Sequence, residues 1–109
     1  MDSILTSIKK LIGVSEEYEH FDADIIMHTN TIFAILNQLG VGPARGFAIR
    51  DESAVWEDFI GDEVLLESVK TYIFLRVKLI FDPPQSSAVM QTMKEQIAEL
   101  EWRLTVHAD

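Results

Sequence analysis

The sequence contains no cysteine, and this absence removes several kinds of structure at once. Without cysteine there is no disulfide framework, and there is no thiolate to act as a nucleophile or as a metal ligand. Disulfide-stabilised secreted scaffolds and cysteine-ligated zinc domains are therefore excluded. A chain of this kind fits a protein that folds and assembles in a cytosol.

Proline and glycine are scarce, with three and five residues in a chain of 109. Such low numbers, together with an ordinary hydrophobic fraction of 48%, argue against long disordered segments. We expect residues 1–109 to fold throughout as a single domain. At this length the core is modest and burial on folding is incomplete, so we also expect stabilisation by partners.

Basic residues are few as well. Nine lysine and arginine residues oppose eighteen aspartate and glutamate residues, which gives a net charge of −9. This balance argues against adhesion to nucleic acid or to an anionic membrane surface. The acids gather in two runs, which are Glu16, Glu17, Glu19, Asp22 and Asp24, and then Asp51, Glu52, Glu57, Asp58, Asp62, Glu63 and Glu67. The simplest interpretation of such runs is a solvated acidic surface.

No hydrophobic run is long enough to cross a bilayer. The most apolar stretch, residues 69–81, contains Lys70, Arg76 and Lys78, whereas a spanning helix needs about 20 predominantly apolar residues. Residues 1–12 are interrupted by charges and lack the apolar centre of a secretory signal. We therefore expect a soluble protein without a signal peptide and without a membrane partner.

The dominant feature of the chain is residues 65–104, which predict two helices joined by a short turn. Asp82-Pro83-Pro84 ends the first helix, because proline has no N–H to donate and disfavours helical geometry in the residue before it. Ser86-Ser87 follows at once, and a serine N-cap can start the next helix. The product is an αα-hairpin at the C-terminal end of an all-α fold.

Four helices in total are expected, forming a small bundle. The first covers residues 4–12 between an N-cap at Ser3 and a stop at Gly13, and the second begins at an Asp22 cap and stops at Gly40. The third begins at an Asp62 cap, and the fourth ends near Leu104. Helical spacing predicts one buried stripe on each of the last three helices. The stripe of the second helix is Ile25, Ile26, Thr29, Ile32, Phe33, Leu36 and Leu39, that of the third is Leu66, Val69, Ile73, Val77 and Ile80, and that of the fourth is Val89, Met90, Met93, Ile97, Leu100 and Leu104. Trp102 lies off the stripe of the fourth helix. A second apolar face on the third helix carries Leu65, Tyr72, Leu75, Leu79 and Phe81, so this helix is central, at an interface, or both.

Residues 40–62 form a long glycine-containing connection without a sustained helical period. Connections of this length in a small domain usually have a function or contact something. Phe47 and Ile49 alternate as in a very short strand, and residues 54–60 are compatible with one or two helical turns that carry Trp56 and Phe59. Two interpretations stay open: the loop folds over its own helices and buries both aromatic side chains, or it contacts a neighbouring subunit.

Signs of catalysis are weak. A serine or threonine nucleophile would need one of His20, His28 and His107, and nothing links them. Asp24 and His28 have a spacing that suits a metal pair, but no second pair of ligands is present. The glycines at 40 and 42 match no phosphate-binding motif. We predict a protein that is not an enzyme and that uses no cofactor and no metal.

Taken together, these segments resemble a known family over nearly the whole chain. The resemblance is carried by residues 21–26 (FDADII), 39–43 (LGVGP) and 56–62 (WEDFIGD), and most strongly by 69–73 (VKTYI) and 81–84 (FDPP). It continues through Ser86-Ser87 to the terminal segment LEWRL at 100–104. The chain is similar to the head-tail connector, or adaptor, proteins of long-tailed double-stranded DNA bacteriophages and related prophages.

This resemblance implies a virion protein at the head-tail interface, assembled in the host cytoplasm. Such a protein forms a homo-oligomeric ring of about twelve copies beneath the portal protein. The ring extends the DNA channel and docks tail-completion or stopper proteins, while DNA passes through without specific binding. On this hypothesis the subunit interface is formed by Val41, Pro43, Phe47, Ile49, Trp56, Phe59, Tyr72, Leu75 and Leu79, and the segment after the last helix, Thr105, Val106, His107, Ala108 and Asp109, docks onto the portal.

An alternative from another class is a small acidic helical binding or regulatory module, such as an inhibitor that mimics nucleic-acid charge. It requires a continuous acidic face and a basic partner, and its affinity would fall steeply with salt. A metal-dependent hydrolase using Asp24 and His28 is a more distant alternative.

Overall fold

The computed structural model describes residues 3–108, and within this range the chain forms five helices and no strand. The helices are α1 (Ile4–Leu11), α2 (Asp22–Gln38), α3 (Trp56–Phe59), α4 (Glu63–Phe81) and α5 (Ser87–Ala108). The all-α prediction is confirmed. The short α3 brings the number of helices from the expected four to five.

Three helix starts follow from their capping residues. The Ser3 hydroxyl accepts a hydrogen bond from the Thr6 backbone N–H at 3.3 Å, and α1 begins at the next residue. Asp62 Oδ1 accepts from the N–H groups of Val64 and Leu65, and α4 follows. These bonds occupy donors that a helix start leaves without an intrahelical partner. Ser86 plays the same part for α5 through a 3.3 Å bond from the Val89 N–H.

The predicted cap at Asp22 is wrong. The N-cap of α2 is Phe21, which makes no side-chain capping bond, and Asp22 is the first helical residue. The Asp22 carboxylate lies instead 2.8 Å from the Lys9 ammonium of α1. The carboxylate therefore joins two helices rather than capping one, and it still lies at the helix end that favours a negative charge.

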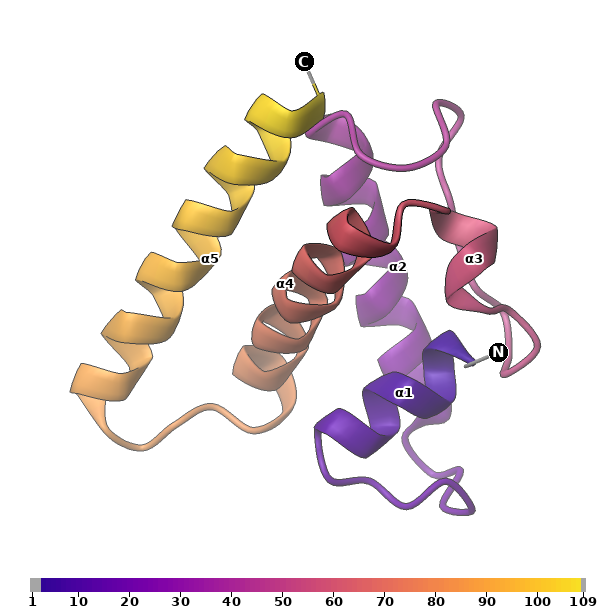
Figure 1. Cartoon of the computed structure of the whole chain (residues 1–109). Coiled ribbons are helices and arrows are strands. Elements are labelled where there is room, and N and C mark those ends of the chain that lie inside the picture. The colour runs from indigo at the N-terminus through magenta and orange to yellow at the C-terminus, as the bar shows by residue number, and fades with distance from the viewer. Residues whose placement is uncertain (1–2, 109) are drawn as a thin grey trace.

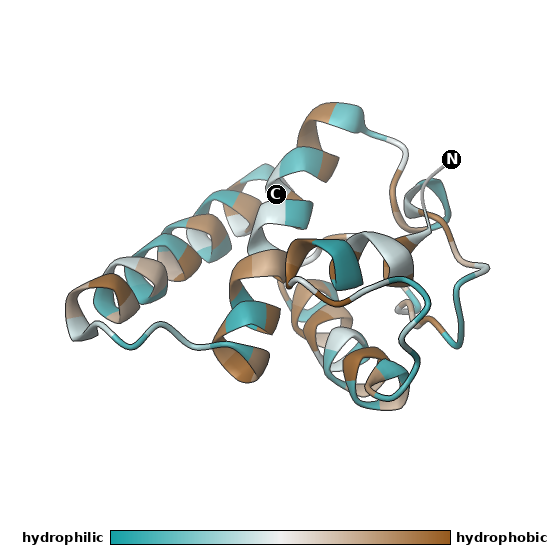
Figure 2. Ribbon diagram, turned by 90° about the horizontal axis from the view of Figure 1, so that it is seen from below, coloured by the Kyte–Doolittle hydropathy of each residue, from teal (hydrophilic) through white to brown (hydrophobic). Residues whose placement is uncertain are grey.

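The helices are arranged with α4 in the middle, next to α5 on one side and α2 on the other, and α1 also packs on α2 (Figure 1). α4 and α5 run in opposite directions and are joined by residues 82–86 (Figure 1). The molecule measures 39 × 37 × 20 Å, so its thin dimension equals about two helix diameters. Hydrophobic and hydrophilic residues alternate along α5 in Figure 2, as expected for a helix with one buried face.

The core contains side chains from all five helices. Its largest fully buried members are Trp56, Tyr72 and Phe33. The predicted stripes are mostly buried, but the prediction is wrong for Ile80 and Val89, whose side chains are 47% and 49% exposed. Both lie where α4 ends and α5 begins. Phe81, the neighbour of Ile80 at this end of α4, packs on His28 of α2, so the contact with α2 is made by Phe81 and leaves Ile80 about half exposed.

The expected short strand at Phe47 and Ile49 is absent from residues 3–108. The backbone of Ile49 pairs with a side chain instead of a strand. Its N–H donates to Asn30 Oδ1 at 2.8 Å, and its carbonyl accepts from Asn30 Nδ2 at 2.9 Å. The Asn30 amide on α2 thus satisfies both backbone groups, as a neighbouring strand would. None of the helices among the described residues is both long and apolar enough to cross a membrane.

Candidate functional site

Most side chains predicted to contact a neighbouring subunit lie in the core of their own chain. Trp56 and Phe59 are 2% and 4% exposed. Val41, Ile49, Tyr72 and Leu75 are also buried, whereas Pro43, Phe47 and Leu79 are partly exposed. Of the two interpretations of the 40–62 connection, the structure therefore supports the one in which the loop folds over its own helices. The buried side chains offer no surface to a neighbour in this conformation.

Aromatic packing holds this connection in place. Phe33 of α2 contacts Phe47 and Phe59, with ring centroids 4.9 and 4.8 Å apart. Gly42 has a φ of +90°, and a Cβ at this position would collide with the Phe59 ring. Only glycine combines this backbone conformation with so close an approach. The loop is thus fixed by the same core that the helices form.

The Trp56 side chain contacts two other helices. Its indole N–H donates to the Ser7 hydroxyl of α1 at 3.2 Å, and the Lys70 ammonium of α4 lies 5.5 Å from the ring centroid. A buried indole usually requires such a hydrogen-bond partner. Trp56 therefore joins α1, α3 and α4 within one subunit.

The segment predicted to follow the last helix is the final part of α5. Residues 105–108 are helical, and Thr105 Oγ1 donates to the Glu101 carbonyl at 2.7 Å. Asp109 lies outside the described residues. The expected free arm is thus replaced by a helix end, because nothing in this segment disfavours helical geometry. His107, Asp62 and Val64 line a hollow of about 180 Å³ beside it.

A polar network between α4 and α5 was not expected from the sequence. Tyr72 Oη donates to Glu101 Oε2 at 2.6 Å, Arg76 Nη2 donates to the same oxygen at 2.6 Å, and Arg76 Nε donates to Tyr72 Oη at 2.7 Å. The pattern offered one hint, because Tyr72 and Arg76 are four residues apart and share a face of an otherwise apolar helix. The partner on α5 follows only from the packing.

This network shifts the pKa values of its members. Burial raises the pKa of the Tyr72 hydroxyl, and its hydrogen bond to Glu101 raises that pKa further. Desolvation alone would raise the pKa of Glu101, but the hydrogen bonds from Tyr72 and Arg76 and the charge of Arg76 outweigh it and lower that pKa. The arrangement is a charge-assisted link between two helices.

Acids of the first run and one acid of the second run, Glu52, lie around a buried lysine. Lys9 is 2% exposed, pairs with Asp22, and donates to the Glu16 carbonyl at 2.9 Å. Glu19 and Glu52, which come from different runs, line the same hollow of about 140 Å³. Because only one lysine lies among these acids, a negative surface remains there.

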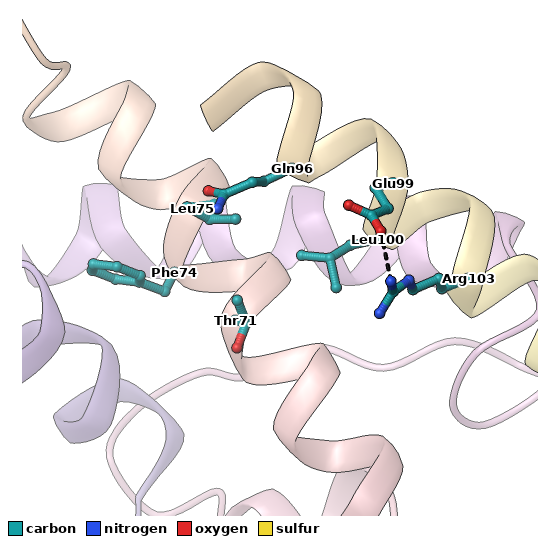
Figure 3. A pocket seen from close by; sticks show the side chains of 7 residues that line it. All are labelled: Thr71, Phe74, Leu75, Gln96, Glu99, Leu100 and Arg103. Atoms are coloured by element: carbon teal, nitrogen blue, oxygen red, sulfur yellow. Dashed lines mark hydrogen bonds and ion pairs between the residues drawn. The ribbon is translucent and has the colours of Figure 1, made fainter. Parts of the chain in front are cut away.

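An apolar groove lies between α4 and α5 (Figure 3). Its volume is about 310 Å³, and it is lined by Thr71, Phe74 and Leu75 of α4 and by Gln96, Glu99, Leu100 and Arg103 of α5. Arg103 Nη2 donates to Glu99 Oε1 at 2.6 Å along one wall. No sequence motif marked this groove, since it arises where two helices approach each other.

Several large apolar side chains among the described residues are mostly exposed. Val64, Trp102 and Val106 are 82%, 67% and 52% exposed. Trp102 is exposed as its position off the buried stripe predicted. An exposed tryptophan of this kind indicates an interaction surface rather than a folding requirement.

The histidines show no catalytic arrangement. His28 packs edge-on against Phe81 with ring centroids 5.4 Å apart, and His20 lies among the aromatic side chains of the 12–21 connection. Between residues 3 and 108 there is no group of three or more side chains placed to hold a metal ion.

Comparison with known proteins gives one result. The model of a protein family described as phage connector protein matches residues 4–109. No curated protein and no solved structure matches the chain.

Proposed function

The chain belongs to the phage connector protein family, and on this premise we propose that it forms a ring under the portal, extends the DNA channel and docks tail-completion proteins. The family is structural rather than enzymatic, and it belongs to the head-tail interface of the virion. The observation that carries the proposal is the extent of the match, which runs from the first described helix to the end of the chain. Residues 1–109 then act as one connector domain, assembled in the host cytoplasm.

The exposed apolar side chains support assembly. A monomer gains nothing by leaving Trp102 two-thirds exposed, whereas tryptophan is among the commonest anchors of protein interfaces. The flat subunit, 20 Å in its thin dimension, also suits lateral packing around an axis. The ring interface then uses the exposed faces of the helices, with Pro43, Phe47 and Leu79 as the members of the predicted interface that keep some surface.

The acidic surface supports the channel. Where Glu16, Glu19 and Glu52 converge, a ring of copies would present a continuous negative lining to the DNA. Such a lining repels phosphates and lets DNA pass, whereas a basic lining would release counterions and bind it. We assign this acidic surface to the lumen of the ring.

The helix ends support docking. The last turn of α5 and the start of α4 together present His107 and Val64 around a shallow hollow, and Val106 is exposed next to it. Thr105, Val106, His107, Ala108 and Asp109 remain the proposed contact to the portal, with residues 105–108 forming a helix end rather than a flexible arm. The tail-completion or stopper protein would bind the opposite rim.

The test is assembly on the portal. The purified chain is mixed with its cognate portal protein, and the mixture is examined by size-exclusion chromatography and negative-stain electron microscopy. The expected result is a ring stacked on the portal. A monomer in the absence of portal agrees with the proposal, since the portal can act as a template. A chain that forms no ring even with portal contradicts it.

A further inference from the structure

The apolar groove of Figure 3 has another hollow beside it on α4. Thr71 and Phe74 also line a second hollow of about 220 Å³, which Leu11, Glu67 and Lys70 complete. Leu11, the last residue of α1, lines the second hollow and is 47% exposed. The two hollows share Thr71 and Phe74 and so lie next to each other along α4, between α5 and α1, and we call the two together the α4 groove.

A row of exposed side chains on α5 could fill such a groove. Ala98, Trp102 and Val106 follow one another at intervals of four residues, so they lie in one row along the helix. All three are exposed, and none lines the α4 groove. The buried residues Met93, Ile97 and Leu104 lie on the other side of the helix. The row 98–102–106 is the outer row of α5.

We propose that the outer row of α5 in one copy of this chain lies in the α4 groove of the next copy, with Trp102 as the anchoring side chain. This inference rests on the proposed function and names the surfaces of its ring. A helix with anchors at regular spacing fits a groove walled by two helices, which is a common mode of recognition. The row and the groove are different surfaces of one subunit, so the contact is head-to-tail, and a contact of this type generates a ring when the rotation between neighbouring copies closes.

Charge explains why this place suits a second copy of an acidic chain. Two copies that each carry a net charge of −9 repel each other, so contact requires a site where opposite charges meet. The α4 groove is balanced in charge, in contrast to the whole chain: Arg103, which is 65% exposed, is paired with Glu99, and Lys70 lies in the same hollow as Glu67. The outer row lies beside the exposed carboxylate of Glu95, two turns before Trp102. The free N–H groups of Arg103 can bind that carboxylate or stack on the indole of the arriving Trp102.

The absence of cysteine makes this contact directly testable. Thr71 in the groove and Ala98 in the outer row are both exposed, so T71C/A98C places one thiol on each proposed surface without removing Trp102. Rings formed on portal are oxidised and run on a non-reducing gel. We expect a ladder of covalent oligomers from the double variant and none from T71C or A98C alone.

The other outcomes separate this inference from the proposed function. Rings that form without a ladder overturn the contact and leave the ring intact. Dimers from A98C alone also overturn it, because they would show two outer rows facing each other. If the portal rather than a second copy occupies the groove, T71C cross-links to a portal cysteine series and no ladder forms. The absence of any ring overturns both proposals.

A second variant tests the anchor. Trp102→Ala should weaken ring assembly by about tenfold or more, as expected for an anchoring tryptophan, while the melting temperature of the free chain stays unchanged because the side chain is exposed. Val89→Ala is the control, since Val89 is another exposed apolar side chain of α5, 49% exposed, but lies outside both surfaces. Equal assembly of the two variants would overturn the proposal.

Discussion

At the level of single side chains, the link formed by Tyr72, Arg76 and Glu101 fixes how α4 meets α5. One carboxylate oxygen accepts from both a phenol and a guanidinium, each at 2.6 Å. Hydrogen bonds to an ionised group are stronger than neutral ones, and they are directional. The groove that we propose as an assembly surface lies between the same two helices, so its width depends on this link.

Glu101→Gln removes the charge and keeps the shape of the side chain. We expect a loss of about 1–2 kcal/mol in the free energy of unfolding at pH 7, because about a third of the surface of Glu101 and Arg76 is exposed and solvent screens their attraction. Urea unfolding at pH 7 measures the loss. Glu99→Gln, in the exposed pair with Arg103, is the control and should change little.

The stabilisation by Glu101 should also depend on pH. The pKa of Glu101 in the folded chain lies below its ordinary value of 4.5, so its contribution to stability is present above that value. The contribution is lost as the pH falls through the folded-state pKa. The difference in stability between the parent chain and Glu101→Gln should therefore be full at pH 7 and shrink at pH 3. A difference that is the same at both pH values would contradict the charged link.

At the level of whole helices, the α4–α5 pair is a rigid frame that depends on a short connection. Asp82 ends α4, with its N–H still bonded to the Lys78 carbonyl at 2.8 Å and its carboxylate 3.0 Å from the Lys78 ammonium. Pro83 and Pro84 follow, and they prevent the helix from continuing. The connection thus sets the point at which the chain reverses.

Replacing both prolines by alanine tests this role. Each proline restricts the unfolded chain, and a compatible proline contributes about 0.4–1 kcal/mol in this way. We expect the double variant Pro83→Ala, Pro84→Ala to lower the melting temperature and to impair ring formation on the portal. Gln85→Ala, a change in the same connection, should leave both unchanged. A double variant that melts and assembles like the parent chain would count against a structural role for this turn.

At the level of the whole molecule, the distribution of charge matters more than its total. Acids from two separate runs of the sequence share one hollow next to Lys9. The apolar groove and the outer row of α5 lie on other parts of the surface. A ring subunit needs such a separation, since one surface must repel DNA while others attach to neighbours.

Reversing charge on the acidic surface tests its place in the ring. Glu16→Lys with Glu52→Lys changes the net charge from −9 to −5, because each reversal adds two charges. Neither carboxylate makes a hydrogen bond or ion pair within the described part of the chain, so the fold should survive. We expect rings of this variant to retain short duplex DNA on a filter at low salt and to release it as salt rises.

The control carries the same net charge at another place. Glu57→Lys with Glu63→Lys also gives −5, and both residues are exposed outside the acidic hollow. Its rings should not retain DNA. Equal retention by the two variants would show that net charge alone controls binding and that the hollow does not line the lumen.

Much of the local structure could be predicted from the sequence because its signals are local. Ser3 and Asp62 start helices through bonds to backbone groups two or three residues away, and Pro83 ends one through its own ring. The exposure of Trp102 also followed from helical periodicity, which assigns each residue to a face. Where a cap has a competing partner, as Asp22 has in Lys9, the local signal failed.

The family, too, was recognisable from the order of its segments along the chain, and the match over residues 4–109 confirms it. What remained open was the destination of each apolar face. Periodicity shows that residues share a side of a helix, but it does not show which element covers that side. For Trp56 and Phe59 the sequence left both a neighbouring subunit and the chain's own core open, and the packing of α1, α2 and α4 places them inside.

The sequence by itself thus determined the four longer helices, most of their ends, the acidity and the family. Only the tertiary structure decided that the 40–62 connection is part of the core, that Glu101 joins Tyr72 and Arg76, and that acids of both runs lie around Lys9. The physical reason is the range of the interactions: caps, turns and periodicity act over a few residues, whereas these contacts join residues far apart in the chain and exist only once the helices have packed.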